Sequence, residues 1–501
     1  MRVVSSNEMK MLERKTIEDF GISNLVLMER AGVSTVEVLW RELGNLSQYS
    51  FLVFCGPGNN GGDGLVIARE LLNFTEAVKV VLISDLTTNE SRKNLEIYKS
   101  FGGEIIKISK ENILDVPKLL ENSNVVIDAI FGTGLSRDVK GIYAEVIDYI
   151  NLYSKFTVSV DIPSGVSADT ANVLGTAIRS DLTVTFEYPK VGHFLFPGRA
   201  LTGKLKVVKI GMPKILSTIY PCDKLLLTNE HFTVPNRLKE SNKSSYGKVI
   251  IIGGSKEFIG APLLSALGAI RAGTGRVYMA GPRDIVKSAV NYEPGIIPIA
   301  IENEYFSEND VNIVNNYIDS DTVVVIGPGL GRKNGVGLFV KKIVGSVNVP
   351  IIIDADAIYH ISNLKDKIKD KDNLVITPHP GEFAKFLGMN ISEVKYNYKL
   401  VKETSKAYNS IIALKDVTTI ISNGESLFFN VTGNSSLSKG GSGDILSGLI
   451  AGFIAQNGDV LNGVLLGVYV FGLAAEMYEY EGHNLISEIL DYIPKAISEV
   501  M

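Results

Sequence analysis

The sequence predicts two α/β domains in tandem. Its 501 residues exceed what one hydrophobic core usually supports. Short runs rich in Val, Ile and Leu alternate with helix-patterned segments, and many of these runs end in a glycine-containing turn. Strands that are almost continuously apolar indicate a parallel sheet covered by helices on both faces. Because a second such series begins after a polar stretch near the middle, we expect two three-layer domains.

In the N-terminal half, residues 1 to about 45 have helical patterning, and we expect them to pack against the sheet or a partner subunit. The strands that follow are expected at residues 51–55, 78–83, 125–130, 157–160, 182–186 and 205–209. This alternation of strands and helices is typical of a doubly wound, Rossmann-like domain, which we place at residues 1–212.

The pattern weakens between about Met212 and Ser245, and the polar stretch 236–245 indicates a linker or a loop before the next domain. Further strands are expected at residues 248–254, 322–326, 350–354, 374–377, 410–415 and 418–422. The series closes with a glycine-rich turn and apolar helices. We place the second domain at residues 225–501.

Composition and charge argue against several functional classes. A formal net charge of -5 is unlike the basic surface that nucleic-acid binding needs. The two cysteines, Cys55 and Cys222, are too few and too far apart for a disulfide framework or a zinc cluster. No signal peptide begins the sequence, and the apolar stretch 463–475 is shorter than the roughly 20 residues that span a bilayer. We therefore expect a cytoplasmic protein with small-molecule ligands and no membrane or nucleic-acid partner.

Three polar loops follow expected strands of the N-terminal half. The first, residues 56–64, reads Gly-Pro-Gly-Asn-Asn-Gly-Gly-Asp-Gly and precedes a helical pattern. Its glycines let the backbone approach a ligand, although such a loop can also serve only as a turn. The other two loops begin at Asp128 and Asp161, and each aspartate could be only a helix cap. Ligands of open α/β sheets gather at the carboxyl ends of strands, so the three loops together favour a binding site.

With residues 27–32, Leu-Met-Glu-Arg-Ala-Gly, these loops resemble the NAD(P)H-hydrate epimerases over residues 1–212. The resemblance implies that Asp161 is the acid–base group acting on the hydrated nicotinamide ring of NADHX or NADPHX. Proton transfer near a carboxylate suits an exchange of two hydroxyl configurations at one carbon. The resemblance also implies a potassium ion held by Asn60, Asp128 and Ser164. The implied substrate-pocket residues are Asn59, Asn60, Gly61, Gly62, Asp63, Gly132, Thr133, Gly134, Leu135, Ser136, Arg137 and Asp138.

The strongest motif of the C-terminal half is residues 432–444, Thr-Gly-Asn-Ser-Ser-Leu-Ser-Lys-Gly-Gly-Ser-Gly-Asp, which lead into an apolar helix pattern. Glycine amides at a helix N-terminus favour the negative charge that develops in phosphoryl transfer. Asp444, just inside the helix, can take a proton from an attacking hydroxyl. A helix cap with a flexible lead-in is the plainer alternative.

The sequence Gly-Ser-Gly-Asp at 441–444 resembles the ribokinase-like kinases. Residues 245–248, 327–331, 354–357 and 377–382 narrow the resemblance to the ADP- or ATP-dependent NAD(P)H-hydrate dehydratases, over about residues 225–500. The resemblance implies that Asp444 is the base for the ring hydroxyl, whose phosphate ester then eliminates. It also implies Mg²⁺ on the nucleotide phosphates. The implied contacts are Ala261, Gly329 and His379 for the hydrated cofactor, and Lys415, Asp416, Val417, Thr418, Thr419, Gly440, Gly441, Ser442 and Gly443 for ADP or ATP.

Several of these residues have simpler interpretations. His379 could be only a hydrogen-bonded loop residue, and Lys415 a solvated strand end. Asp354 and Asp356 could form a turn, so neither receives a catalytic role. The chain also departs from the family at Asp416, where glycine is common, and this leaves the choice between ADP and ATP open.

The two resemblances predict a bifunctional enzyme that epimerises hydrated NAD(P)H and dehydrates the S form at the expense of ADP or ATP. We expect it to form a homo-oligomer. Two alternatives stay open. The C-terminal half could be a true small-molecule kinase, and the N-terminal half a non-catalytic interaction module like those of mRNA-decapping scaffolds.

Overall fold

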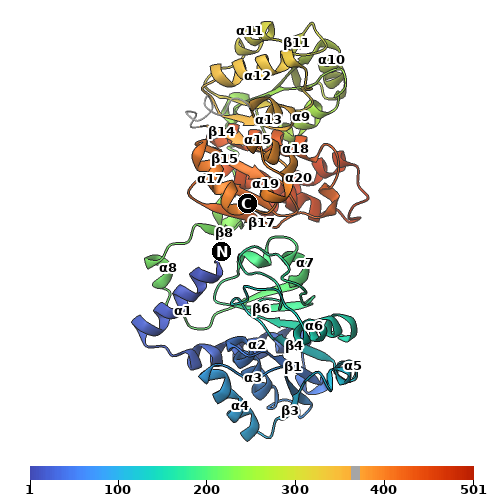
Figure 1. The fold of residues 1–501 in the computed structure, drawn as a ribbon. Coiled ribbons are helices and arrows are strands. Elements are labelled where there is room, and N and C mark those ends of the chain that lie inside the picture. Colours follow the sequence, from blue (N-terminus) through green and yellow to red (C-terminus); the bar gives the residue numbers. More distant parts are fainter. Residues whose placement is uncertain (363–372) are drawn as a thin grey trace. The chain divides into compact units, whose positions relative to one another are not determined.

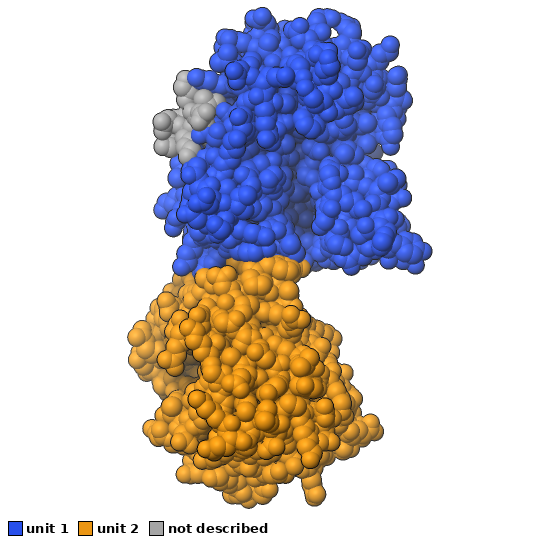
Figure 2. Space-filling model, turned by 45° about the vertical axis from the view of Figure 1, so that its right-hand side comes forward, with its two compact units in different colours: residues 1, 223–501 blue, residues 2–222 orange. Residues whose placement is uncertain are grey.

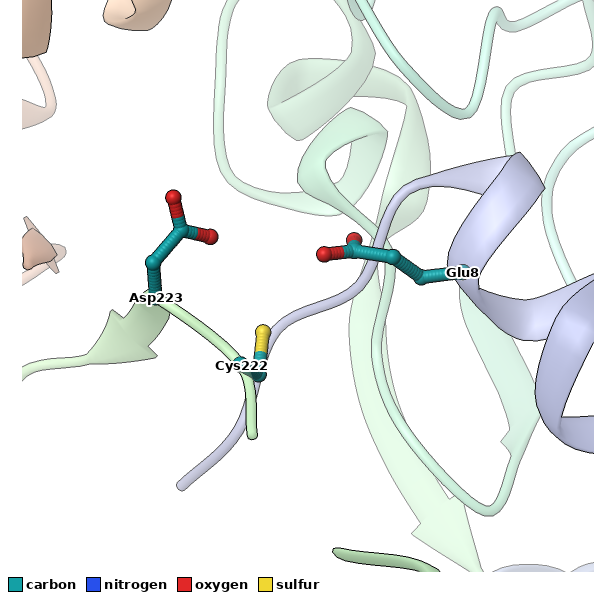
Figure 3. A group of neighbouring side chains, drawn as sticks. All are labelled: Glu8, Cys222 and Asp223. Carbon is teal, nitrogen blue, oxygen red and sulfur yellow. The ribbon is translucent and has the colours of Figure 1, made fainter. Parts of the chain in front are cut away.

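The computed structural model describes residues 1–362 and 373–501, and these form two compact units. Arg2–Cys222 make the N-terminal unit, and Asp223–Met501 with Met1 make the C-terminal unit (Figures 1 and 2). The units meet along the chain at Cys222 and Asp223, both labelled in Figure 3. The polar stretch 236–245 is therefore not the linker, because it lies inside the C-terminal unit.

A seven-stranded parallel sheet forms the centre of the N-terminal unit, in the order β3-β2-β1-β4-β5-β6-β7. Its strands are β1 (Phe51–Cys55), β2 (Val78–Leu82), β3 (Glu104–Lys107), β4 (Val125–Ala129), β5 (Thr157–Val160), β6 (Leu182–Phe186) and β7 (Lys204–Val208). The order reverses between β1 and β4, as in a doubly wound sheet, which confirms the predicted fold class. Only β3 was missed, because this edge strand starts and ends with exposed charged residues.

Helices cover both faces of this sheet. They are α1 (Ser6–Phe20), α2 (Asn24–Leu43), α3 (Asn59–Leu71), α4 (Asn89–Ser100), α5 (Val116–Glu121), α6 (Ile142–Tyr153), α7 (Gly198–Thr202) and α8 (Leu216–Ile219). Phe51 and Val53 of β1 join the core that α2 and α3 complete, whereas the alternate residues Leu52 and Phe54 join the core of α5 and α6. This alternation gives the expected three layers.

The C-terminal unit contains a ten-stranded sheet in the order β11-β10-β9-β12-β13-β14-β15-β16-β17-β8. Its strands are β8 (Lys224–Leu226), β9 (Lys248–Ile252), β10 (Arg276–Pro282), β11 (Ile296–Ile301), β12 (Thr322–Ile326), β13 (Ile351–Ile353), β14 (Leu374–Ile376), β15 (Ser410–Leu414), β16 (Thr419–Ser422) and β17 (Leu427–Asn430). The run from β11 to β15 is parallel, and β16 lies antiparallel to both its neighbours.

The expected strands of this unit are present, but β8, β10, β11 and β17 were missed. Pro298 interrupts the apolar run of β11, and β8 spans three residues only. The helices are α9 (Ala261–Ala272), α10 (Arg283–Tyr292), α11 (Val311–Asn315), α12 (Asn334–Ser346), α13 (Ala355–Ile361), α15 (Pro380–Leu387), α16 (Ile391–Val394), α17 (Tyr398–Ala407), α18 (Ser442–Asn457), α19 (Val460–Glu476) and α20 (Ile489–Glu499). The apolar stretch 463–475 lies in α19, and none of the described helices is long and apolar enough to cross a membrane.

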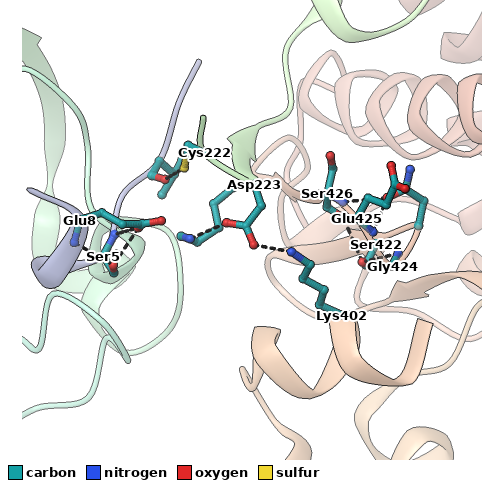
Figure 4. A network of polar contacts seen from close by, with 12 residues as sticks. Ser5, Glu8, Cys222, Asp223, Lys402, Ser422, Gly424, Glu425 and Ser426 are labelled. Carbon is teal, nitrogen blue, oxygen red and sulfur yellow. Dashed lines mark hydrogen bonds and ion pairs between the residues drawn. The ribbon is translucent and has the colours of Figure 1, made fainter. Parts of the chain in front are cut away.

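Polar contacts hold the start of each unit (Figure 4). Ser5 caps α1, and the carboxylate of Glu8 accepts a hydrogen bond from the Ser5 backbone N–H at 2.6 Å. In the C-terminal unit, Asp223 forms ion pairs with Lys224 and Lys402 at 2.6 and 2.5 Å. Burial alone would raise the pKa of Asp223, but the two ammonium groups lower it overall. These contacts define where α1 begins and tie the chain before β8 to α17.

Helices α9 and α18 pack closely because glycines lie at their crossing. A Cβ on Gly448 would lie 1.8 Å from the carbonyl oxygen of Ser265, and a Cβ on Gly268 would lie 2.3 Å from that of Ile445. The backbones of the two helices are therefore in direct contact. This contact positions the N-terminal end of α18, which carries the glycine amides predicted to bind the phosphoryl group.

We expect Gly448→Ala to lower the free energy of unfolding of the C-terminal unit by about 3 kcal/mol, since the methyl group forces α9 and α18 apart. Thermal denaturation followed by circular dichroism measures the effect. Gly345→Ala is the matched control, because Gly345 is also helical and a Cβ there meets nothing within 4 Å. Equal melting temperatures for the two variants would contradict the assigned packing.

Candidate active sites

The predicted loop of residues 56–64 is a turn over residues 56–58 followed by the start of α3, which begins at Asn59. The turn contacts the loop after β4 through backbone atoms. A Cβ on Gly56 would lie 1.8 Å from the carbonyl oxygen of Ile130, and one on Gly61 would lie 2.1 Å from that of Gly56. No larger residue fits at either position, so glycine is required there by close approach. The two predicted loops therefore meet at the carboxyl edge of the sheet.

A cavity of about 550 Å³ opens at this edge. Its wall contains ten of the predicted residues, namely Asn59, Asn60, Asp63, Gly132, Thr133, Gly134, Leu135, Ser136, Arg137 and Asp161. Gly61 and Gly62 lie outside the wall, buried in α3, where a Cβ on Gly62 would strike Met28. Asp138 also lies outside the wall and contacts Lys140 at 3.5 Å. The structure thus brings most of the predicted substrate pocket together.

Asp161 lies just after β5, with a left-handed backbone φ of 70°. Its carboxylate contacts the ammonium of Lys190, a side chain that is 1% exposed, and accepts a hydrogen bond from Thr185 Oγ1 at 3.2 Å. Lys190 also donates to Thr185 Oγ1 at 2.9 Å. Burial alone would raise the pKa of Asp161, but the charge and hydrogen bond of Lys190 lower it overall. Asp161 is therefore held as a carboxylate facing the cavity.

His193 fixes the backbone around this pair. Its Nδ1 accepts a hydrogen bond from the Lys190 backbone N–H at 3.0 Å, so its Nε2 donates to the Asp161 carbonyl at 3.0 Å. Burial, with the nearby charge of Lys190, lowers the pKa of His193 to about 3, and the imidazole is neutral. Neither Lys190 nor His193 was expected at the site from the sequence. The signal was the lysine shortly after β6, next to the apolar Val191, because a lysine that is buried needs a carboxylate partner.

Two further carboxyl groups line the same cavity, Asp63 from α3 and Glu13 from α1. Burial, strengthened by the charge of Asp161, raises the pKa of Asp63 well above its usual range. Burial and Asp161 likewise raise the pKa of Glu13 to about 7. Glu13 was not anticipated from the sequence, because α1 lies far from the three loops along the chain.

Of the predicted potassium ligands, Asn60 lies in this cavity wall, whereas Asp128 and Ser164 lie behind it. Asp128 is fully buried and accepts hydrogen bonds from Ser159 Oγ, Ser164 Oγ and the Ser164 N–H at 2.7, 2.5 and 2.9 Å. The Asn60 Nδ2 atom is buried and has no acceptor among the residues that the structure describes. If the Asn60 amide were turned so that its oxygen lay at this position, the oxygen would be a ligand for a cation. Carboxylate, hydroxyl and amide oxygens form a hard donor set that suits such an ion.

A larger cavity, of about 820 Å³, lies in the C-terminal unit. Nine predicted residues line it, namely His379, Lys415, Asp416, Val417, Thr419, Gly441, Ser442, Gly443 and Asp444. Thr418 is fully buried, and Gly440 lies just outside the wall. Ala261 and Gly329 also lie outside it but close to each other, since a Cβ on Gly329 would be 3.3 Å from that of Ala261.

The N-terminus of α18 forms one end of this cavity. Gly441 caps the helix with a left-handed φ of 94°, and Asp444 is the third helical residue. The ammonium of Lys415 lies 2.6 Å from Asp354 Oδ1 and would be 3.1 Å from a Cβ on Gly443. The backbone amides at the N-terminus of α18 and the ammonium of Lys415 thus face the same space, which suits the binding of an anion.

Asp444 is mostly buried beside other acids. Burial, with the charge of Asp354, raises the pKa of Asp444 to about 7, although Lys415 opposes the shift. A carboxyl group with such a pKa can accept and release a proton near neutral pH. The geometry therefore places a base next to the anion-binding N-terminus of α18.

The structure changes the interpretation of Lys415 and Asp354 and adds to that of His379. Lys415 is not a solvated strand end, because it is 19% exposed and paired with Asp354. Asp354, which received no catalytic role, lies in the cavity wall, whereas Asp356 accepts hydrogen bonds from the Gly331 N–H and Arg332 Nε. His379 caps α15 through Nδ1, as the simpler interpretation held, yet it also lines the cavity.

Comparison with known proteins gives a match for each unit. The family model described as YjeF-related protein N-terminus matches residues 24–192, and the one described as NAD(P)H-hydrate dehydratase matches residues 249–495. A protein of Moorella thermoacetica named bifunctional NAD(P)H-hydrate repair enzyme Nnr is 35% identical over 99% of this chain and 96% of its own length. A protein of the same name from Thermofilum pendens is 33% identical over the same shares.

Solved structures similar to the C-terminal unit include the ADP/ATP-dependent NAD(P)H-hydrate dehydratase of Bacillus subtilis, co-crystallised with ATP/Mg²⁺. It is 28% identical, covers 55% of this chain and 99% of its own, and has a TM-score of 0.47. A ribokinase-like superfamily protein of Enterococcus faecalis is 24% identical, covers 56% of this chain and 96% of its own, and has a TM-score of 0.49.

Proposed function

This chain belongs to the family of bifunctional NAD(P)H-hydrate repair enzymes, and from this premise we propose which reaction each of its two cavities catalyses. The N-terminal cavity interconverts the R and S forms of hydrated NAD(P)H. The C-terminal, ribokinase-like domain returns the S form to NAD(P)H at the expense of ADP or ATP. The observation that carries the second assignment is Asp444, placed beside the helix amides and Lys415.

In the N-terminal cavity, Asp161 accepts the proton that the substrate hydroxyl or an attacking water must lose. Lys190 keeps this carboxylate ionised, and Thr185 orients it through a hydrogen bond. Asn59, Asn60 and Asp63 at the start of α3 and the loop at 132–137 hold the rest of the substrate. Asn60, Asp128 and Ser164 would hold a potassium ion, which supplies a fixed positive charge next to the pocket when bound.

In the C-terminal cavity, Asp444 takes the proton of the ring hydroxyl as its oxygen attacks the terminal phosphorus of the nucleotide. The bond to the leaving nucleotide breaks, and AMP or ADP is released. The new phosphate ester then leaves the ring as inorganic phosphate while the neighbouring carbon loses a proton, which restores the double bond. Lys415 and the amides of Ser442 and Gly443 stabilise the charge on the migrating phosphoryl group.

Magnesium suits this cavity, because the carboxylates of Asp354 and Glu382 line it and Mg²⁺ prefers oxygen ligands. When bound, the ion screens the nucleotide phosphates. His379, Lys415, Asp416, Val417 and Thr419 would contact the nucleotide or the hydrated cofactor.

We also propose that the enzyme works in the cytoplasm as a homo-oligomer. Its substrates are damaged forms of coenzymes used inside cells. Large apolar side chains are exposed on α2, where Trp40 is 57% and Val26 48% accessible, and this supports a subunit contact.

Incubating each epimer of hydrated NADH with the full-length protein tests the function. With nucleotide, both epimers should regain the absorbance of reduced nicotinamide. Without nucleotide, they should only interconvert. Accumulation of a stable phosphorylated alcohol would instead indicate a small-molecule kinase.

Asp416 should contribute nucleotide affinity without taking part in the chemistry. Its Oδ1 accepts a hydrogen bond from the Val417 N–H at 2.8 Å, whereas Oδ2 is buried with no donor among the described residues. A ribose hydroxyl or an adenine amino group would supply that donor. We expect Asp416→Ala to raise the KM for the nucleotide about tenfold with kcat nearly unchanged, as loss of one hydrogen bond to a charged group predicts.

Steady-state kinetics with ADP and with ATP measure this effect. Asp284→Ala, at an exposed position on α10 of the same unit, is the control. An unchanged nucleotide KM in Asp416→Ala would remove Asp416 from the binding site.

A further inference from the structure

Glu13 reaches the epimerase cavity from outside the matched family segment. It lies on α1, whereas the family model begins at residue 24, yet its side chain lines the same cavity as Asp161. We propose that Glu13 is the proton donor of the epimerisation and works with Asp161 as the proton acceptor. This inference rests on the proposed epimerase function.

The packing of α1 holds Glu13 at the cavity wall. Ser6 donates from its N–H and its hydroxyl to the carboxylate of Asp169, both at 2.6 Å, so the first turn is anchored to the unit. Met9 and Leu12 are buried in the core beneath the helix. Because residues four apart lie on the same helix face, Glu13 shares the inward face with Met9, which also lines the cavity.

The charges around the cavity separate the roles of the two carboxyl groups. Lys190 directly contacts Asp161 and favours its ionised form. Burial and the negative charge of Asp161 favour the protonated form of Glu13, against the weaker opposing charges of Lys190 and Lys10. Two carboxyl groups whose environments push their pKa values apart are suited to act as a base and an acid in one reaction.

The proposed step moves one proton from Glu13 to Asp161. Glu13 protonates the ring hydroxyl, the carbon–oxygen bond breaks, and water leaves while the electron pair of the adjacent ring nitrogen forms a carbon–nitrogen double bond. A water molecule then adds to the opposite face of the ring, and the proton that it loses goes to Asp161. Exchange with solvent returns both carboxyl groups to their starting states. The hydroxyl is inverted, and no oxidant or reductant is needed.

Glu13→Gln in the full-length protein tests the proposal, because glutamine keeps the shape but cannot donate the proton. We expect the kcat for conversion of R to S hydrate to fall about 100-fold, with KM within about twofold, as loss of a general acid predicts. Proton NMR measures the conversion, after subtraction of the spontaneous rate. Glu13→Asp should recover part of the loss, and Glu18→Gln, exposed on the same helix, should match the wild type.

The pH profile separates a proton donor from a structural residue. Glu13 is protonated below its pKa of about 7, so the wild-type epimerisation kcat should fall as the pH rises through that value. The charged groups that face Glu13 are Asp161, Asp63, Lys190 and Lys10. In Glu13→Gln this decline should disappear.

Dehydration of the S hydrate, which the other unit performs, should be equal in all variants, and thermal denaturation followed by circular dichroism shows whether the N-terminal unit stays folded. Wild-type kcat in Glu13→Gln, a loss confined to KM, or a retained decline with pH would each overturn the role of Glu13. Failure of the wild type itself to interconvert the epimers would instead overturn the epimerase function.

Discussion

Asp444→Asn is expected to lower the kcat of dehydration about 1,000-fold or more, with both ADP and ATP. Asparagine preserves the shape of the side chain at the start of α18, but it cannot take the proton from the ring hydroxyl. The initial rate at which reduced-nicotinamide absorbance returns from the S hydrate measures the loss. Epimerisation should be unchanged, because Asp161 lies in the other unit.

Asp459→Asn is the matched control, since Asp459 only caps α19 and asparagine caps equally well. If Asp444→Asn consumed hydrate at the wild-type rate, the assignment of the base would be wrong. The pH dependence gives a second check. A base must be deprotonated to act, and the pKa of Asp444 is raised to about 7, so the dehydration kcat should rise as the pH increases through that value.

Asp161→Asn is expected to lower the epimerisation kcat about 1,000-fold and to leave dehydration of the S hydrate untouched. The asparagine cannot accept a proton. It also leaves the ammonium of Lys190 buried without its charged partner, and such a loss typically costs about 3–5 kcal/mol of stability. A decrease in activity alone could therefore come from unfolding of the N-terminal unit.

The double variant Asp161→Asn with Lys190→Met separates these two causes. It removes both charges and keeps an apolar stem in the buried space, so the melting temperature should largely recover. Epimerisation should stay lost. Recovery of epimerisation together with stability would mean that Asp161 only balances the charge of Lys190.

The sequence was most informative where local chemistry determines structure. The continuous apolar runs identified strands such as β1 and β12 nearly to the residue, since strands buried on both faces have few alternatives. The glycine loops were also identifiable, because Gly56 and Gly441 meet steric or conformational demands that other residues do not satisfy.

The sequence was least informative about residues that tertiary structure brings together. Lys190 contacts Asp161, and Glu13 lines the same cavity, from segments that lie far apart along the chain. Asp354 resembles an ordinary turn residue until Lys415 is seen beside it. Strands β3 and β11 were missed because edge position and an internal proline hide the apolar pattern.

The central claim is that the C-terminal cavity phosphorylates the ring hydroxyl before it leaves. Dehydration of S hydrate that carries ¹⁸O in this hydroxyl tests the claim most directly, with mass spectrometry of the released inorganic phosphate. The Asp161→Asn variant is used, because epimerisation by the other unit would exchange the labelled hydroxyl with water. We predict that each phosphate contains one ¹⁸O atom, because the oxygen deprotonated by Asp444 becomes a phosphate oxygen. Unlabelled phosphate with ¹⁸O in the solvent water would contradict this account.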